Sequence, residues 1–142
     1  MGSIIFTHGD CDGICSGAIV KSALGKPDVF FTSPVSLLGD LESLERRYDD
    51  IVICDIAIDE KTSRELEIKL DELAEVSNVI YVDHHPLPAR KYDAEWFYHG
   101  TCSAAELAYL IFEKKLDRDE TCGYIRRYRR IQRKHDCKKM GA

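Results

Sequence analysis

Short apolar runs alternate with longer amphipathic stretches through the first 120 residues of the chain. The apolar runs have the length and the β-branched or aromatic content of strands, and turn residues bound them. Strands are expected at residues 3–7, 29–32, 51–54 and 79–82, with a fifth, edge-like strand at 95–98. Helices are expected at about 14–24, 37–46, 62–76 and 103–116. Such alternation is typical of an α/β fold in which a mainly parallel sheet of about five strands has helices on both faces.

Two of the predicted helices carry signals for their ends and their inward faces. Asp59 is expected to cap the third helix, and Ser103 and Glu106 have the spacing of a capping box at the start of the fourth. The apolar periodicity predicts which side chains of these two helices face inward. They are Leu66, Leu70, Leu73 and Ala74 in the third helix, and Leu107, Leu110 and Ile111 in the fourth.

Acidic residues and histidines follow three of the predicted strands directly. They are His8, Asp10 and Asp12 after the first strand, Asp55 after the third, and Asp83, His84 and His85 after the fourth. Because parallel strands end at one edge, where open α/β sheets bind ligands, these side chains are expected to converge. A single Asp after a strand is usually a turn residue or a helix cap, and this is the favoured interpretation of Asp55 taken alone. Three such coincidences at one edge favour a site for divalent metal ions and phosphate chemistry.

Two metal ions about 3.5–4 Å apart require a carboxylate that bridges them. Asp55 stands alone at the end of a central strand and is the natural bridge. Gly9 and Gly13 are expected to let the first loop turn sharply and approach its ligands closely.

Length and composition indicate one soluble domain with most of its surface buried on folding. No apolar stretch approaches the roughly 20 residues of a membrane span, and a strand from Ser3 leaves no room for a secretory signal, so a cytoplasmic location without a membrane partner is expected. The six cysteines include no Cys-x-x-Cys pair and are interpreted as small apolar residues in a reducing compartment. Zinc at Cys11, Cys15 and His8 is the less favoured alternative, because carboxylates favour a harder metal.

The net charge of −5 is divided unevenly along the chain. Residues 121–142 contain eight basic residues and one acid, a net charge of +7, which leaves −12 for residues 1–120. The acidic body suits a metal site and argues against a general nucleic-acid-binding surface on it.

The His8-x-Asp10-x-Asp12-Gly13 element, Asp55 after an apolar strand, and Asp83-His84-His85 together resemble the first three motifs of the DHH phosphoesterase superfamily. The resemblance covers about residues 3–120. This superfamily includes RecJ-type single-strand exonucleases, oligoribonuclease-like enzymes, cyclic-dinucleotide phosphodiesterases and manganese pyrophosphatases. The resemblance therefore implies hydrolysis of a phosphodiester in single-stranded nucleic acid or in a small nucleotide.

The resemblance also implies roles for individual residues. One Mn²⁺ would be held by His8, Asp10 and Asp55, and a second by Asp12, Asp55 and His84, with Mg²⁺ as an alternative ion. Asp83 and His85 would be catalytic: Asp83 would ligate a metal or orient a ligand, and His85 would face the scissile phosphate. Gly100–Ser103 resembles the phosphate-contact segment, so Thr101 and Ser103 are candidate substrate-binding residues, although Ser103 fits a plain N-cap equally well. His99 and Arg90 are near enough in sequence to reach the same edge.

The chain departs from the family pattern beyond residue 116. A fourth motif of the Gly-Ala-Ile-Gly-Asp type is expected there, whereas residues 125–135 are strongly basic and contain no carboxylate. One codon choice for residues 125–136, read from the second base, encodes Tyr-Gly-Ala-Ile-Gly-Glu. We therefore interpret 1–120 as a partial catalytic domain and 121–142 as an out-of-frame, poorly packed tail, and expect little or no turnover.

Two alternatives remain open. The first is a hydrolase resembling the manganese pyrophosphatases, which is disfavoured because that family spaces its first His and Asp residues more widely. The second is a non-catalytic protein that binds nucleic acid through the basic tail and its contacts to phosphates. The sequence leaves the oligomeric state undetermined.

Overall fold

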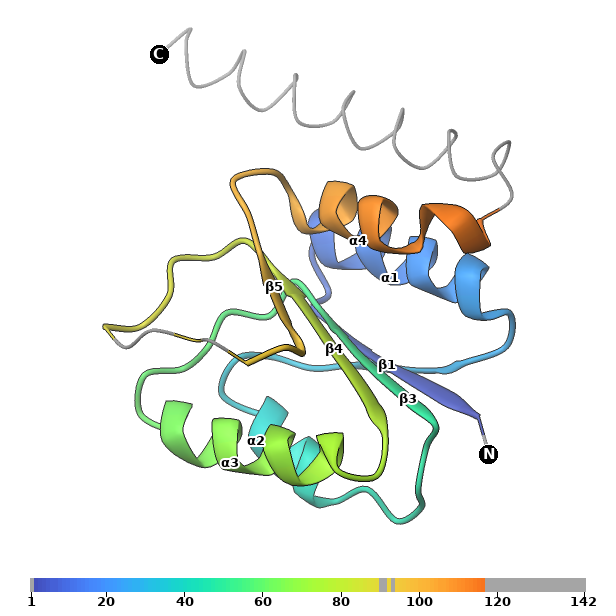
Figure 1. The fold of residues 1–142 in the computed structure, drawn as a ribbon. Helices are drawn as coiled ribbons and strands as arrows, with labels where there is room; N and C mark the ends of the chain where they lie inside the picture. The colour runs from blue at the N-terminus through green and yellow to red at the C-terminus, as the bar shows by residue number, and fades with distance from the viewer. Residues whose placement is uncertain (1, 90–91, 93, 117–142) are drawn as a thin grey trace, which may run out of the picture.

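A five-stranded, fully parallel sheet forms the centre of the computed structural model, which describes residues 2–89, 92 and 94–116 (Figure 1). The strand order is β2-β1-β3-β4-β5. The strands are β1 (Ser3–Thr7), β2 (Asp28–Phe31), β3 (Asp50–Cys54), β4 (Asn78–Asp83) and β5 (Phe97–His99). The predicted fold class is confirmed, and the fifth strand lies at an edge as expected.

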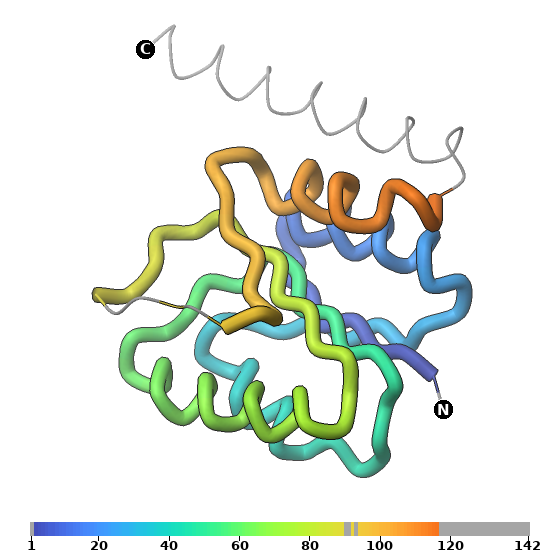
Figure 2. The backbone as a smooth tube through the Cα atoms, viewed as in Figure 1, coloured from blue at the N-terminus to red at the C-terminus, as the bar shows by residue number. Residues whose placement is uncertain are grey.

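Helices cover both faces of the sheet (Figures 1 and 2). One face carries α1 (Cys11–Leu24) and α4 (Ala104–Phe112), which pack along each other, and a 3₁₀ turn, η1 (Glu113–Lys115), follows α4. The opposite face carries α2 (Leu37–Glu42) and α3 (Ser63–Ala74). Within the described ranges, no helix has the length and apolar content needed to cross a membrane. The predicted boundary at residue 120 and the tail at 121–142 lie outside the described residues.

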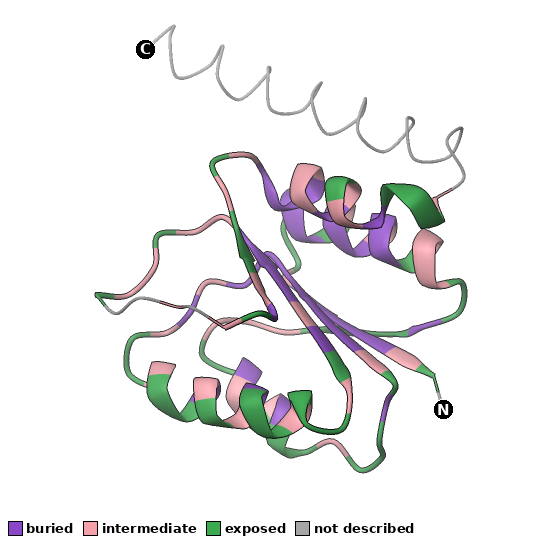
Figure 3. Cartoon of the chain, viewed as in Figure 1, coloured by how far each residue is buried: buried purple, intermediate pink, exposed green. Residues whose placement is uncertain are grey.

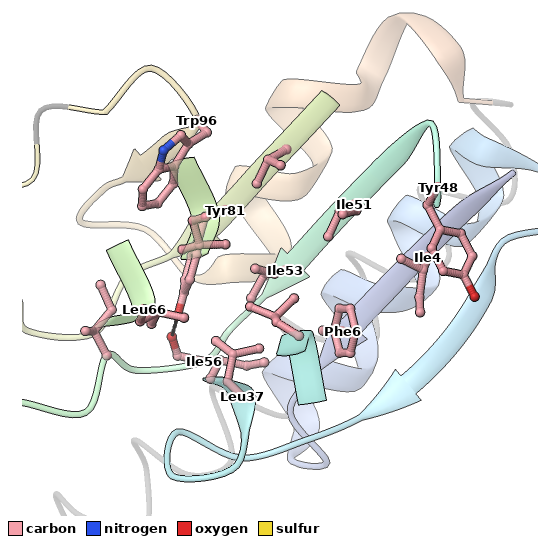
Figure 4. Packing of buried hydrophobic residues seen from close by; sticks show 14 residues of the cluster. Ile4, Phe6, Leu37, Tyr48, Ile51, Ile53, Ile56, Leu66, Tyr81 and Trp96 are labelled. Carbon is pink, nitrogen blue, oxygen red and sulfur yellow. Dashed lines mark hydrogen bonds between the residues drawn. The ribbon is translucent and has the colours of Figure 1, made fainter. Parts of the chain in front are cut away.

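The central strands are buried on both faces, which explains their nearly continuous apolar sequences (Figure 3). One core lies between the sheet and α2 and α3, where Phe6, Ile53 and Tyr81 meet Leu37 and Leu66 (Figure 4). The other lies under α1 and α4 and contains Ile5, Val52 and Val82. Alternate residues of each strand therefore feed opposite cores, so the strand ends are rigidly placed.

Several expectations for the helices are wrong in detail. The first helix begins at Cys11 because Asp10 caps it, and the second ends at Glu42. Asp59 does not cap α3: its carboxylate accepts from the Lys61 N–H at 3.1 Å in the preceding turn, and Thr62 occupies the N-cap.

The inward faces of two helices also differ from expectation. Ala74 is the last residue of α3 and is exposed, and Leu110 of α4 is 60% exposed. The buried face of α4 consists of Ala104, Ala105, Ala108 and Phe112, with Leu107 and Ile111 half-buried beside it. Leu110 lies about 200° around the helix from Ala108, which turns it towards solvent.

Candidate metal centre

The three acidic segments converge at the carboxyl edge of the sheet. His8 follows β1, Asp55 follows β3, and His84 follows β4, and these strands are neighbours in register. The parallel sheet therefore brings together side chains from residues 8 to 85 of the chain, as the pattern of strand ends predicts.

Asp55 is the centre of this arrangement. Its side chain is 1% exposed, and neither carboxylate oxygen makes a well-formed hydrogen bond to a described residue, although His84 Nε2 lies 3.2 Å from Oδ1. Its backbone has φ +57°, in the left-handed region that residues other than glycine rarely adopt, and its N–H donates to the Val82 carbonyl at 2.9 Å. A buried carboxylate without well-formed hydrogen bonds, on a strained backbone, indicates a ligand-binding position.

Two groups of candidate ligands share Asp55. The first contains His8, Asp10 and Asp55, and the second Asp55, His84 and His85; within each group the ligand atoms lie within 4.8 Å of one another. The first group has the composition predicted for one ion. The second contains His85 where the prediction placed Asp12. A carboxylate common to both groups is the arrangement that a two-ion centre requires.

Asp12 lies beside the second group but has other partners. Its oxygens accept hydrogen bonds from the N–H groups of Ala104 at 3.0 Å and Ala105 at 2.9 Å, at the start of α4. The same carboxylate lies 3.0 Å from His84 Nε2, which also lies 3.2 Å from Asp55 Oδ1. Asp12 thus supports His84 and anchors α4 at the same time.

Asp83 and His85 form a close pair. His85 Nδ1 lies 2.6 Å from Asp83 Oδ1 and 3.7 Å from Asp55 Oδ1. Asp83 is 1% exposed, and its Oδ2 has no donor among the described residues. Because Asp83 holds the Nδ1 side of the ring, the Nε2 side of His85 is left for another partner.

Backbone geometry positions the first loop. Asp10 accepts from the Gly13 N–H at 2.8 Å as the N-cap of α1, and its other oxygen lies 3.1 Å from His8 Nδ1. A Cβ on Gly13 would lie 2.2 Å from the His8 carbonyl oxygen, so glycine is required there. Nothing lies within 4 Å of a Cβ built on Gly9, so the close approach expected at that glycine is not observed.

The carboxylates perturb one another's ionisation. Burial, with the adjacent Asp10, Asp12 and Asp83, raises the pKa of Asp55 to about 9. Burial also raises the pKa of Asp12, against the hydrogen bonds from α4. For Asp10, burial is outweighed by the Gly13 hydrogen bond and by Asp55 and His8, so its pKa is lowered. A divalent cation would offset this mutual repulsion, and the orphaned Asp55 oxygens with imidazoles around them fit Mn²⁺ or Mg²⁺.

The predicted phosphate-contact segment has a structural role at α4. Ser103 is the N-cap, with its Oγ accepting from the Glu106 N–H at 3.2 Å, which confirms the capping box. The first N–H groups of α4 point to Asp12, so that carboxylate, rather than a free anion, occupies the helix N-terminus. Thr101 is exposed. Substrate contacts by Thr101 and Ser103 stay predictions.

The cysteines lie outside both groups among the described residues. Cys11 and Cys15 are free thiols, and burial together with Cys11 raises the pKa of Cys15 to about 11. Because the described residues bring carboxylates and imidazoles together but no thiol, the carboxylate and imidazole groups are the better candidates for a metal site.

Sequence reasoning missed the bonds between Asp12 and the start of α4, and the closeness of His85 to Asp55. The capping box marked where α4 begins, but which carboxylate lies against it depends on helix packing. The geometry therefore adds Ala104 and Ala105 to the residues that shape this site.

The chain matches the family model for the DHH family, N-terminal domain, over residues 3–133. A comparison with curated proteins gives no match. Among solved structures, an uncharacterised protein from Helicobacter pylori G27 superposes with a TM-score of 0.58 at 18% identity, covering 82% of this chain and 38% of that chain. RecJ from Thermus thermophilus, in complex with Mn²⁺, superposes with a TM-score of 0.53 at 22% identity, covering 78% of this chain and 17% of that chain.

At these identities the two structures show a common fold, and this chain spans well under half of either. The family match covers most of the chain and contains the three acidic segments. It also continues into the basic segment after residue 120, whose out-of-frame origin stays a prediction. The chain belongs to the DHH family and is a member of the DHH phosphoesterase superfamily.

Proposed function

We propose that this protein is a Mn²⁺-dependent phosphodiesterase that acts on single-stranded nucleic acid or a small nucleotide. The single observation that carries the proposal is Asp55, a buried carboxylate that makes no well-formed hydrogen bond to a described residue and is shared by two groups of candidate metal ligands. The manganese in the similar RecJ structure supports the choice of ion, and mixed carboxylate and imidazole donors suit Mn²⁺, with Mg²⁺ as an alternative.

In this proposal His8, Asp10 and Asp55 hold one ion, and Asp12, Asp55 and His84 hold the second. When bound, such ions lower the pKa of water and neutralise charge on phosphate oxygens. The protein's own part is to keep the two groups a fixed distance apart, and it does so by placing their ligands at the ends of adjacent, hydrogen-bonded strands. Residues 125–135 contain no carboxylate, so we expect the second ion to bind more weakly and turnover to be low.

His85 is the proposed catalytic contact to the scissile phosphate, and Asp83 acts through it. The 2.6 Å contact to Asp83 fixes the orientation of the imidazole ring. The Nε2 atom can then donate to a phosphate oxygen or to the leaving oxygen. This role would make His85→Ala lower kcat while the first group, which does not contain His85, still binds its Mn²⁺.

The test is a Mn²⁺ titration by calorimetry, combined with hydrolysis of a single-stranded oligonucleotide. Asp10→Ala is expected to lose binding of the first ion and all measurable hydrolysis. Glu72→Ala is the matched control, because Glu72 is an exposed acid whose ion pair with Lys69, at 3.5 Å, contributes little. A wild-type chain that binds no Mn²⁺ would refute the proposal.

The same variants separate the alternatives. A protein that only binds nucleic acid through residues 121–142 would retain oligonucleotide affinity in Asp10→Ala and lose it when this basic segment is deleted. A pyrophosphatase would hydrolyse pyrophosphate faster than any phosphodiester. Robust exonuclease activity of the wild type would instead show that the missing fourth carboxylate is dispensable.

A further inference from the structure

A column of aromatic rings leads away from the candidate metal centre along β5. The exposed His99 ring stacks on Phe97, with centroids 6.2 Å apart and planes inclined by 14°. Phe97 in turn packs against Tyr81 at 5.2 Å and against the edge of Trp96 at 5.9 Å. These distances are typical of favourable aromatic pairs. The column therefore has one exposed end, at His99, and a buried base.

The base of this column is held in place by hydrogen bonds. Tyr81 is fully buried and donates its hydroxyl to the Ile56 carbonyl at 2.6 Å (Figure 4). Trp96 donates its indole N–H to Asp71 Oδ1 at 2.9 Å. Because its supporting rings are fixed, His99 is presented on a preorganised platform rather than on a mobile loop.

The exposed end of the column lies next to the phosphate chemistry. His99 is the register partner of Asp83 across the parallel β4–β5 ladder, so the two residues are neighbours at the carboxyl edge and project to the same face of the sheet. Asp83 contacts His85, the proposed phosphate contact. A group that stacks on His99 would thus lie about one strand spacing, roughly 5 Å, from the Asp83–His85 pair, which is proposed to face the phosphate.

We propose that His99, supported by Phe97, is a stacking subsite for a nucleobase adjacent to the scissile phosphate. This inference rests on the proposed function and specifies its substrate as a nucleotide rather than an inorganic or sugar phosphate. The exposed face of the His99 ring favours a flat group, because a planar ring can stack on it as His99 itself stacks on Phe97. Every base can stack on an aromatic face, so the subsite would select nucleotides over base-free phosphates without distinguishing one base from another.

The experiment compares adenosine 5′-monophosphate with ribose 5-phosphate, each titrated calorimetrically into the Mn²⁺-loaded chain. Base stacking of ordinary strength makes the nucleotide bind about 5- to 150-fold more tightly than the base-free phosphate. His99→Ala should abolish most of this preference while leaving the affinity for ribose 5-phosphate and for Mn²⁺ unchanged. His99→Phe should retain it.

Tyr98→Ala is the matched control. Tyr98 is also an aromatic residue of β5, 42% exposed, but it projects to the opposite face of the sheet. A second readout is the fluorescence of 2-aminopurine riboside 5′-monophosphate, which stacking quenches in the wild type and in His99→Phe but not in His99→Ala.

The outcomes distinguish this inference from the proposed function. If wild type and His99→Ala bind both phosphates alike in the presence of Mn²⁺, the nucleobase subsite is wrong and the metal-dependent phosphate site stands. If Tyr98→Ala rather than His99→Ala loses the preference, the base lies on the other face and the subsite at His99 is wrong. If the wild type binds neither Mn²⁺ nor phosphate, both proposals fail.

Discussion

At the scale of single residues, two positions at the carboxyl edge of the sheet have a backbone conformation or a close contact that core packing alone does not require. Asp55 adopts φ +57° although it is not glycine, and Gly13 lies where any Cβ would overlap the first loop. Gly13 packs against the backbone of His8, and His8 and Asp55 belong to the same group of candidate metal ligands. Strain of this kind persists where the surrounding structure holds it, and it concentrates at functional sites.

The first prediction concerns Gly13. Gly13→Ala would place a Cβ 2.2 Å from the His8 carbonyl oxygen and 2.9 Å from the His8 Cβ, so the loop must shift. We expect a loss of about 2–3 kcal/mol in the free energy of unfolding, measured with urea, and weaker Mn²⁺ binding through the displaced His8. Gly9→Ala is the control and should be neutral within about 0.5 kcal/mol, since no atom lies within 4 Å of its Cβ. Equal stability of the two variants would contradict the steric argument.

At the scale of elements, the Asp12 carboxylate links two helices to the candidate metal centre. Asp12 lies in the first turn of α1, and both of its oxygens receive N–H groups from the first turn of α4. A negative charge at a helix N-terminus also interacts favourably with the helix dipole. The position of α4 on the sheet and the orientation of His84 therefore depend on the same side chain.

The second prediction concerns this junction. Asp12→Ala leaves the buried N–H groups of Ala104 and Ala105 without an acceptor, and should cost about 2–3 kcal/mol. Hydrogen exchange should accelerate at those two amides before it does in the central strands. Asp10→Ala serves as the comparison, because it removes the α1 cap, worth about 1 kcal/mol, and the contact to His8, but no hydrogen bond to α4, and it should leave exchange at the start of α4 unchanged. Unaltered exchange in Asp12→Ala would refute the coupling.

At the scale of the whole molecule, the metal-free fold carries concentrated negative charge at one edge. The pKa of Asp55 is raised to about 9 from a usual value of 3.8, so the folded state holds this proton more tightly than the unfolded state does. Stability contributed by protonated Asp55 is present at low pH and is lost as pH rises between these two values. Bound divalent cations would offset this repulsion.

The third prediction follows from the loss of stability that the raised pKa of Asp55 causes as pH increases. Asp55→Asn should raise the Tm of the metal-free protein at pH 8 by about 5–10 °C, because asparagine has no proton to take up on folding, whereas Asp55 is ionised in the unfolded state and must bind a proton when it is buried. It should also flatten the fall in Tm that we expect for the wild type between pH 5 and pH 9, and abolish the rise in Tm that we expect Mn²⁺ to produce in the wild type. Thermal unfolding with and without a chelator measures all three. A metal-free Asp55→Asn variant less stable than the wild type would show that Asp55 is structural.

Residues in regular elements were predictable because their signals are local. Alternating apolar and amphipathic segments define strands and helices through side-chain periodicity, and the capping box at Ser103 is a contact across three residues. The errors lie where helix faces meet neighbours: Leu110 is exposed and Ala104, Ala105 and Ala108 are buried, because α4 packs closely on α1 through small side chains. Sequence periodicity identifies an apolar face of a helix, but the packing of the neighbouring helix determines which face is buried.

The sequence by itself determined the α/β architecture, the parallel direction of the strands and the convergence of His8, Asp55 and His84 at one edge, since strand direction and chain order suffice for these. Only the tertiary structure decided how the ligands divide between the two groups, that Asp12 lies against α4, and that His99 lies beside Asp83. These relations join residues up to 93 positions apart, and they are set by how helices and strands pack rather than by any local pattern.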